Sequence, residues 1–126
     1  MCITSLNTKL ELLQKLWKKK DIQAIFDQLY TDKTEISGQG TTNLFTGKDA
    51  LTMLLQELVE GSSAVNLSIF KSTELNNQLI LTWVNWTVYT DDKNSYFTMK
   101  SLFLWQEINQ DWKIIADMYA DEAIVS

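Results

Sequence analysis

The chain has 126 residues, the size of one domain, and its composition of 45% hydrophobic and 21% charged residues is that of an ordinary globular protein. It contains no His, Arg or Pro and a single Cys, which excludes histidine-based catalytic triads, histidine metal sites, arginine clamps on phosphate and an internal disulfide. The formal net charge of −5 disfavours nucleic acid and anionic membranes as partners.

The first predicted element is an amphipathic helix. Apolar residues recur at helical spacing between Leu6 and Trp17. Its N-cap is expected at Thr8, as the start of a capping box, or one turn earlier at Ser5. The three lysines at positions 18–20 lie where positive charge favours the end of a helix.

Two further helices are predicted before residue 62. Asp21 is the expected N-cap of a helix whose apolar face comprises Ile22, Ile25, Phe26 and Leu29. A short strand is expected near Glu35–Ile36, followed by a loop over residues 37–43. The third helix should begin at Gly47–Asp49 and end at Gly61, because glycine is common where helices end.

The remainder of the chain is predicted to be a meander of antiparallel strands. The strands are expected over residues 65–70, 79–89, 95–108 and 112–123, joined by turns at 76–77, 91–94 and 109–111. The turn at 76–77 is expected because asparagine tolerates a positive φ angle. Helices followed by strands indicate an α+β fold with the helices on one face of the sheet.

The last strand carries two contrasting sets of side chains. One set comprises Trp112, Ile114, Ala116, Met118 and Ala120, and the alternate set comprises Lys113, Ile115, Asp117, Tyr119 and Asp121. In one interpretation the second set faces water and the first faces the core. In the other, the second set lines a pocket between sheet and helices, and the tryptophan-bearing set lies on the outer face under a second subunit.

Asp117 and Asp121 are the candidate catalytic residues. A carboxylate beside tyrosine and tryptophan and away from water has a raised pKa, and it can act as a general acid or base near neutrality. Taken as neighbours on one strand face, the pair is expected to share a proton or to straddle a small ligand. The alternative is that both are ordinary solvated surface acids.

Large apolar side chains are expected on both faces of the sheet. In the third strand, one face carries Phe97, Met99, Phe103 and Trp105, and the other carries Lys100, Leu102, Leu104 and Gln106. Helices cover one face only, so a lone copy would expose an unusually large apolar patch. We therefore expect a homodimer through the outer face of the sheet.

Three segments carry a resemblance to a known family. Residues 21–26 and 29–32 resemble the GDxxAIxxLYxDD signature of SnoaL-like members of the nuclear-transport-factor-2-like superfamily, which includes the ketosteroid isomerases. Gly47–Leu51 is similar to the segment that opens the third helix in that family, and residues 111–117 resemble its terminal G-x-W-K-I-x-x-D strand. Together these matches extend from about Leu6 to Ala123.

The resemblance implies a specific architecture and site. The fold would be a cone, with three N-terminal helices packed on a curved, mostly antiparallel sheet (a cystatin-like α+β roll), as a single domain over residues 1–126. A ligand cavity lies inside such a cone, and dimers form through the outer sheet face. The residues that would line the cavity are Trp17, Phe26, Tyr30, Lys100, Leu102, Leu104, Asp117, Tyr119 and Asp121.

The catalytic positions of the ketosteroid isomerases are not retained. The general base of those enzymes falls on Gly38 and their two oxyanion donors fall near Leu13 and Leu104, none of which can transfer a proton or donate a side-chain hydrogen bond. We therefore expect a different activity on the same fold.

The function expected is binding of a small, apolar or mixed-polarity molecule in a largely apolar pocket. Acid–base chemistry by Asp117 or Asp121 would make the protein a lyase, an isomerase or a hydrolase, without a metal or other cofactor. The alternative is a non-catalytic dimerisation or protein-association module of the same fold. Residues 1–7 lack the features of a signal peptide and no stretch approaches a membrane span, so we expect a cytoplasmic protein that binds neither membrane nor nucleic acid.

Overall fold

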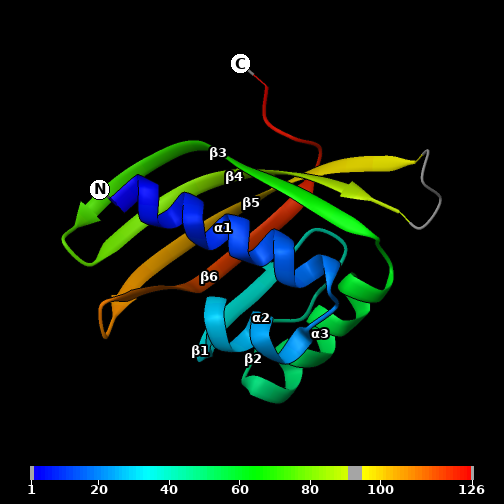
Figure 1. The fold of residues 1–126 in the computed structure, drawn as a ribbon, viewed down its shortest axis with the longest axis horizontal. Helices are drawn as coiled ribbons and strands as arrows, with labels where there is room; N and C mark the ends of the chain where they lie inside the picture. The colour runs from blue at the N-terminus through cyan, green and yellow to red at the C-terminus, as the bar shows by residue number, and fades with distance from the viewer. Residues whose placement is uncertain (1, 91–94, 126) are drawn as a thin grey trace.

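The computed structural model describes residues 2–90 and 95–125, in which three helices pack on one face of a six-stranded curved sheet (Figure 1). The helices are α1 (Cys2–Lys18), α2 (Ile22–Leu29) and α3 (Lys48–Glu60), and the strands are β1 (Tyr30–Gly38), β2 (Phe45–Thr46), β3 (Ala64–Asn76), β4 (Leu79–Tyr89), β5 (Tyr96–Ile108) and β6 (Asp111–Asp121). The predicted α+β fold, with helices on one face of a mostly antiparallel sheet, is confirmed.

The strand order is β2-β1-β6-β5-β4-β3, and β1 and β6 are the parallel pair. In Figure 1, α1 lies along β3, while α2 and α3 lie beside the β1 end of the sheet. None of the helices in residues 2–90 and 95–125 combines the length and apolarity needed to cross a bilayer.

The helix caps were predicted with mixed success. The carboxylate of Asp21 caps α2 by accepting a hydrogen bond from the backbone N–H of Ala24 at 3.1 Å, as predicted. The caps predicted at Ser5 and Thr8 are wrong, because α1 begins earlier and both residues lie within it. The hydroxyl of Thr8 instead donates to the carbonyl of Thr4, one turn back along the same helix.

The structure also differs from the predictions for the short strands and the turns. Strand β1 is longer than predicted, and β2 follows the segment expected to be a loop. Asn76 does not adopt positive φ; its side-chain oxygen accepts a hydrogen bond from the N–H of Gln78 at 2.8 Å. Positive φ angles occur instead at Asn109 and Gln110, in the predicted turn between β5 and β6, and elsewhere at Lys20 and Glu122. The turn predicted at 91–94 lies outside the described residues.

Three buried tryptophans at the inner face of the sheet, which packs against the helices, donate their indole N–H groups to Ser or Thr hydroxyls. Trp105 donates to the hydroxyl of Thr82 at 2.9 Å, and Trp86 donates to the hydroxyl of Ser101 at 3.0 Å. Trp17, on α1, donates to the hydroxyl of Ser62 at 2.8 Å. A buried indole needs such a partner, so single Ser and Thr residues are placed between apolar neighbours.

A β-bulge in β6 determines which side chains face inward. Leu104 pairs with Ala116 and Trp105 pairs with Ile114, so Ile115 is an extra residue that has no partner on β5. Trp112 and Ile114, before the bulge, are buried in the core, whereas Met118, after it, is 64% exposed. The prediction that Trp112 and Ile114 lie on the outer face is therefore wrong.

The same bulge turns Asp117 and Tyr119 toward the inner face of the sheet. Asp117 pairs with Phe103 and Tyr119 pairs with Ser101, and Phe103 and Ser101 are both buried. Since directly paired residues point to the same side of a sheet, Asp117 and Tyr119 face the helices. The adjacent strand β1 is irregular at the same level, between Tyr30 and Glu35, which adds to the curvature of the sheet there.

Candidate ligand pocket

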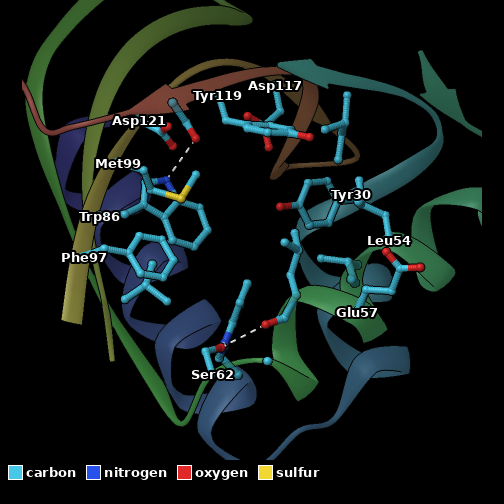
Figure 2. A pocket seen from close by; sticks show the side chains of 17 residues that line it. Tyr30, Leu54, Glu57, Ser62, Trp86, Phe97, Met99, Asp117, Tyr119 and Asp121 are labelled. Atoms are coloured by element: carbon cyan, nitrogen blue, oxygen red, sulfur yellow. Dashed lines mark hydrogen bonds between the residues drawn. The ribbon is translucent and has the colours of Figure 1, made fainter. Parts of the chain in front are cut away.

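A pocket of about 310 Å³ opens between the inner face of the sheet and helices α1 and α3 (Figure 2). Cavities that hold small organic molecules usually begin at about this size. The walls are mostly apolar and aromatic, and the lining residues are Trp17, Tyr30, Ile36, Leu54, Leu55, Glu57, Leu58, Gly61, Ser62, Trp86, Val88, Phe97, Met99, Ser101, Asp117, Tyr119 and Asp121. Of the lining residues predicted from sequence, the structure brings together Trp17, Tyr30, Asp117, Tyr119 and Asp121.

Asp117 is the polar group at the buried end of this pocket. Only 9% of its surface is exposed, and its Oδ1 atom has no hydrogen-bond partner among the described residues. Burial raises the pKa of Asp117 from its ordinary value of 3.8 to about 7, while a hydrogen bond with Ser101 acts in the opposite direction. The carboxyl group therefore populates both its neutral and its charged form near neutral pH.

Two tyrosines lie beside Asp117. Burial, and then the charge of Asp117, raise the pKa of Tyr30 well above its ordinary value, and the same two causes raise that of Tyr119. Both hydroxyls therefore stay protonated and are available as hydrogen-bond donors. In Figure 2 the hydroxyl end of Tyr30 is directed into the open centre of the pocket.

Ser101 links Asp117 to the aromatic wall. Its hydroxyl accepts the hydrogen bond from the Trp86 indole and is also hydrogen-bonded to Asp117. A hydroxyl has one proton to donate, so accepting from Trp86 leaves that proton for the carboxylate. This chain of contacts fixes both side chains at the pocket wall.

The mouth of the pocket carries two exposed acidic residues, Glu57 on α3 and Asp121 at the end of β6. The half-exposed side chains of Leu58 and Phe97 complete the rim. Asp121 follows Asp117 by four residues on the strand, about 13 Å at the usual rise per residue. The expectation that these two carboxylates share a proton is therefore wrong.

Four of the predicted lining residues lie elsewhere. Phe26 is buried in the core, beneath the Lys48 ammonium group at 5.8 Å from its ring centroid. Lys100, Leu102 and Leu104 alternate with the inward residues of β5 and point to the outer face, where Leu104 lines a shallow groove. These four residues therefore do not line the pocket, and their predicted roles there are wrong.

Sequence reasoning missed the lining residues contributed by α3 and by β4. Leu54 and Leu55 lie in the predicted third helix and Trp86 lies in the strand predicted over residues 79–89, but none of them was predicted to line a cavity. Ser101 was the detectable signal, because it interrupts an otherwise apolar strand face between Met99 and Phe103. A lone hydroxyl among buried apolar residues indicates a specific partner.

The overall architecture is similar to solved structures over nearly the whole chain. An NTF-2 like protein of unknown function from Shewanella oneidensis superposes with a TM-score of 0.82 at 16% identity, covering 96% of this chain and 100% of the other. A domain of unknown function with a cystatin-like fold from Nostoc punctiforme gives 0.78 at 10% identity, covering 97% and 78%. The chain has the nuclear-transport-factor-2-like fold.

A ketosteroid isomerase-like protein from Erwinia carotovora shares this nuclear-transport-factor-2-like fold, with a TM-score of 0.75 at 15% identity and 96% of each chain covered. No protein-family model and no curated protein sequence matches the chain significantly. The resemblance predicted from sequence is thus confirmed for the fold, and membership in the SnoaL-like group stays a prediction. Structural similarity at such low identity carries no activity with it.

Proposed function

We propose that the protein binds a small, largely apolar organic molecule in the pocket between the sheet and helices α1 and α3, and that Asp117 exchanges a proton with it. The observation that supports this most directly is the buried Oδ1 atom of Asp117, which has no hydrogen-bond partner among the described residues. A buried carboxyl without a full set of partners is costly for the fold. A bound molecule with one polar group would supply the missing partner.

The chemistry that suits this arrangement is acid–base catalysis. With a pKa of about 7, Asp117 can accept or donate a proton near neutral pH, as a lyase, an isomerase or a hydrolase requires. The hydroxyls of Tyr30 and Tyr119 would donate hydrogen bonds to charge that develops on the substrate. Asp121, at the mouth, would act in ligand entry rather than in proton transfer.

The isomerisation of ketosteroids is not part of this proposal. Gly38, where those enzymes would carry their general base, has no side chain and lies against Tyr119. Leu13, one of the positions matched to an oxyanion donor, is buried in the core. Leu104, the other, points to the outer groove.

The titration of Asp117 tests the acid–base part of the proposal. Carboxyl NMR signals of the wild type and of Asp117→Asn should assign a pKa of about 7 to this residue. Because the folded-state pKa lies above the unfolded one, the neutral carboxyl stabilises the fold fully below pH 3.8, and this contribution is lost as the pH rises to about 7. Asp117→Asn should abolish that fall in stability. A measured pKa near 4 for Asp117 in the wild type would contradict its catalytic role.

Ligand binding is tested separately with the indole N–H signals of the tryptophans. Trp17 and Trp86 line the pocket, and Trp83 lies on the outer face of β4 as an internal control. Single-ring organic probes should shift the signals of Trp17 and Trp86 and leave that of Trp83 unchanged. If neutral, cationic and anionic probes all fail to shift them, the binding proposal is wrong.

A second candidate function is association with another copy through the outer face of the sheet. Trp83, Leu102 and Met118 are direct cross-strand partners there, and Trp83 and Met118 are 37% and 64% exposed. Such a row of large apolar side chains favours a protein interface. A homodimer of this kind is compatible with a ligand pocket on the inner face.

The cytoplasmic location stays a prediction from sequence.

A further inference from the structure

The charged side chains that line the pocket are all acidic. Its buried end carries Asp117 and its mouth carries Glu57 and Asp121, while none of its lining residues within the described part of the chain is a lysine. The chain has neither arginine nor histidine to supply a positive charge instead. A ligand that enters this pocket therefore meets three carboxyl groups and no cation among these residues.

The walls that separate these carboxyl groups are rich in aromatic rings. Trp17 and Trp86 pack edge to face with their centroids 5.5 Å apart, and both line the cavity. Tyr30, Tyr119 and Phe97 complete the aromatic lining (Figure 2). The face of an aromatic ring carries partial negative charge and attracts organic cations, most strongly where water is excluded.

We propose that the ligand of this pocket is an organic amine in its ammonium form, whose positive group pairs with the Asp117 carboxylate while its apolar body lies among the aromatic rings. This inference rests on the proposed function and names its ligand class. The unpartnered Oδ1 atom of Asp117 supplies the acceptor that the ammonium group needs. Glu57 and Asp121 attract the cation to the mouth.

Other ligand classes use this site less completely. An anion would be repelled by all three carboxyl groups and would find no described cation in the lining. A neutral alcohol could accept or donate one hydrogen bond at Asp117, but its uncharged polar group would gain no cation–π attraction from the aromatic faces and no charge attraction from the acidic mouth. The cation alone benefits from the buried carboxyl group, the aromatic faces and the acidic mouth together.

The volume limits the size of the amine. The cavity of about 310 Å³ equals about ten water molecules at roughly 30 Å³ each. One ring with a short aminoalkyl chain fills such a space, so 2-phenylethylamine is a suitable probe.

Binding of the amine must be coupled to ionisation of Asp117. The titratable groups that act on this residue or line its pocket are Tyr30 on β1 and Tyr119 on β6, which interact with Asp117, and Asp121 on β6 and Glu57 on α3, which lie at the mouth. Lys20 is engaged with the backbone carbonyls of Val59 and Ser62. When the cation binds to the neutral form, the carboxyl O–H bond breaks, the electron pair stays on the oxygen and one proton leaves to solvent.

This coupling sets the sign of the pH dependence. With a pKa of about 7, the ionised fraction of Asp117 rises between pH 6 and pH 8 by about tenfold. Affinity for 2-phenylethylamine, which is protonated throughout this range, should rise by the same factor.

The experiment compares three probes of matched shape: 2-phenylethylamine, 2-phenylethanol and 3-phenylpropionate. The indole signals of Trp17 and Trp86 report binding, with Trp83 as the internal control. At pH 8 we expect the amine to bind about tenfold more tightly than the alcohol, and the anion to cause no shift. Asp117→Asn should reduce affinity for the amine about tenfold and remove its pH dependence.

Two further variants keep the inference falsifiable. Asp32→Asn, at an exposed residue beside the outer groove, is the matched control and should bind like the wild type. Glu57→Gln, at the exposed mouth, should weaken amine binding about two- to threefold at low salt, even if Asp117→Asn does not fold.

The outcomes separate this inference from the proposed function. Equal affinity for amine and alcohol, tighter binding of the anion, or amine binding that does not change with pH would each overturn the amine assignment and leave a small-molecule pocket. Failure of all three probes to shift Trp17 and Trp86 would contradict both proposals.

Discussion

At the scale of single residues, Gly38 shows how closely β1 packs on β6 at the position where the resemblance to the ketosteroid isomerases would place a general base. A Cβ atom built on Gly38 would lie 2.4 Å from the carbonyl oxygen of Tyr119 and 2.6 Å from its ring. Non-bonded atoms do not approach so closely, so only glycine fits while Tyr119 keeps its place. The space that a carboxylate side chain would need is filled by a tyrosine ring.

Gly38→Ala should therefore destabilise the protein. The new methyl group must displace the Tyr119 backbone or ring, and overpacking of this kind costs about 1–3 kcal/mol. Urea unfolding measures the loss in free energy of unfolding. Gly61→Ala is the matched control, because its Cβ would have its nearest neighbour at 3.4 Å and its φ of −82° suits any residue. Equal stability of the two variants would contradict the close packing of Tyr119 on Gly38.

At the scale of secondary-structure elements, the sequence predicted the order of helices and strands but not which faces of β6 and β5 point inward. Strict alternation along β6 places Trp112 on the same side as Met118, whereas in the structure Trp112 is buried and Met118 is exposed. The cause is the extra residue, Ile115, which shifts the register with β5. A bulge depends on pairing between strands, and the sequence of one strand does not reveal it.

The lining residues that could be predicted from sequence are those whose direction follows from alternation along a single strand. Asp117 and Tyr119 both follow the bulge, so their relative sidedness was predicted correctly from alternation. The outward placement of Leu104 was not, because it required the register between β5 and β6. The contribution of Leu54 from α3 depends on how the helix docks on the sheet, which periodicity alone does not specify.

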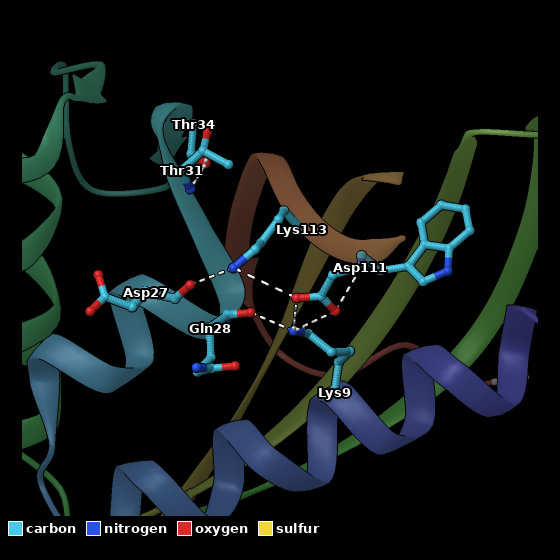
Figure 3. Close-up of polar contacts among 8 residues, drawn as sticks. Lys9, Asp27, Gln28, Thr31, Thr34, Asp111 and Lys113 are labelled. Carbon is cyan, nitrogen blue, oxygen red and sulfur yellow. Dashed lines mark hydrogen bonds and ion pairs between the residues drawn. The ribbon is translucent and has the colours of Figure 1, made fainter. Parts of the chain in front are cut away.

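Another element-scale feature is the set of charged contacts at the end of α2 (Figure 3). Lys9 on α1 donates to the carbonyl of Gln28 and contacts both carboxylate oxygens of Asp111 at 3.1 Å. Lys113 on β6 donates to the carbonyl of Asp27 and lies 3.8 Å from Asp111. Two ammonium groups thus satisfy the last carbonyls of the helix, with one carboxylate between them.

Asp111→Asn should destabilise the fold by about 1–3 kcal/mol, because Lys9 is only 8% exposed and would lose its counter-charge. The half-exposed position of Asp111 limits the loss to this range. In the double variant with Lys9→Met, the change at Asp111 leaves no buried charge unpaired. The loss in free energy of unfolding of the double variant should therefore be smaller than the sum of the losses of the two single variants. Urea unfolding of both single variants and the double variant measures the coupling. Glu74→Gln, at an exposed residue of β3, serves as the control, and strict additivity would contradict the pairing.

At the scale of the whole molecule, the sheet presents different chemistry on its two faces. The inner face carries the pocket and the core, while the outer face carries Trp83 and Met118. The segment after β6 also reaches this outer face. The Asn85 side chain donates to the carbonyl of Ile124 at 2.9 Å and accepts from its N–H at 2.9 Å. A second copy that docks here must therefore fit against Ile124 as well as the sheet.

The proposed homodimer gives a prediction at this scale. The wild-type chain should sediment as a dimer at micromolar concentration, and Met118→Lys should shift it to the monomer, because a buried charge without a partner opposes association. Met53→Lys is the matched control: Met53 is 66% exposed on α3, away from the sheet, and this variant should remain dimeric. A monomeric wild type would contradict the proposed interface and leave the pocket proposals intact.

The extra residue at 115 also determines what a small deletion would do to this strand. Without it, Ile114 and Ala116 would be consecutive and would still pair with Trp105 and Leu104, so Asp117 would keep its pairing with Phe103 and its inward direction. Deletion of Asp117 itself would instead move Met118 into register with Phe103 and turn its thioether toward the cavity. Two nearby single-codon losses would therefore have opposite outcomes: one would only straighten the strand, and the other would replace a carboxyl group with a thioether.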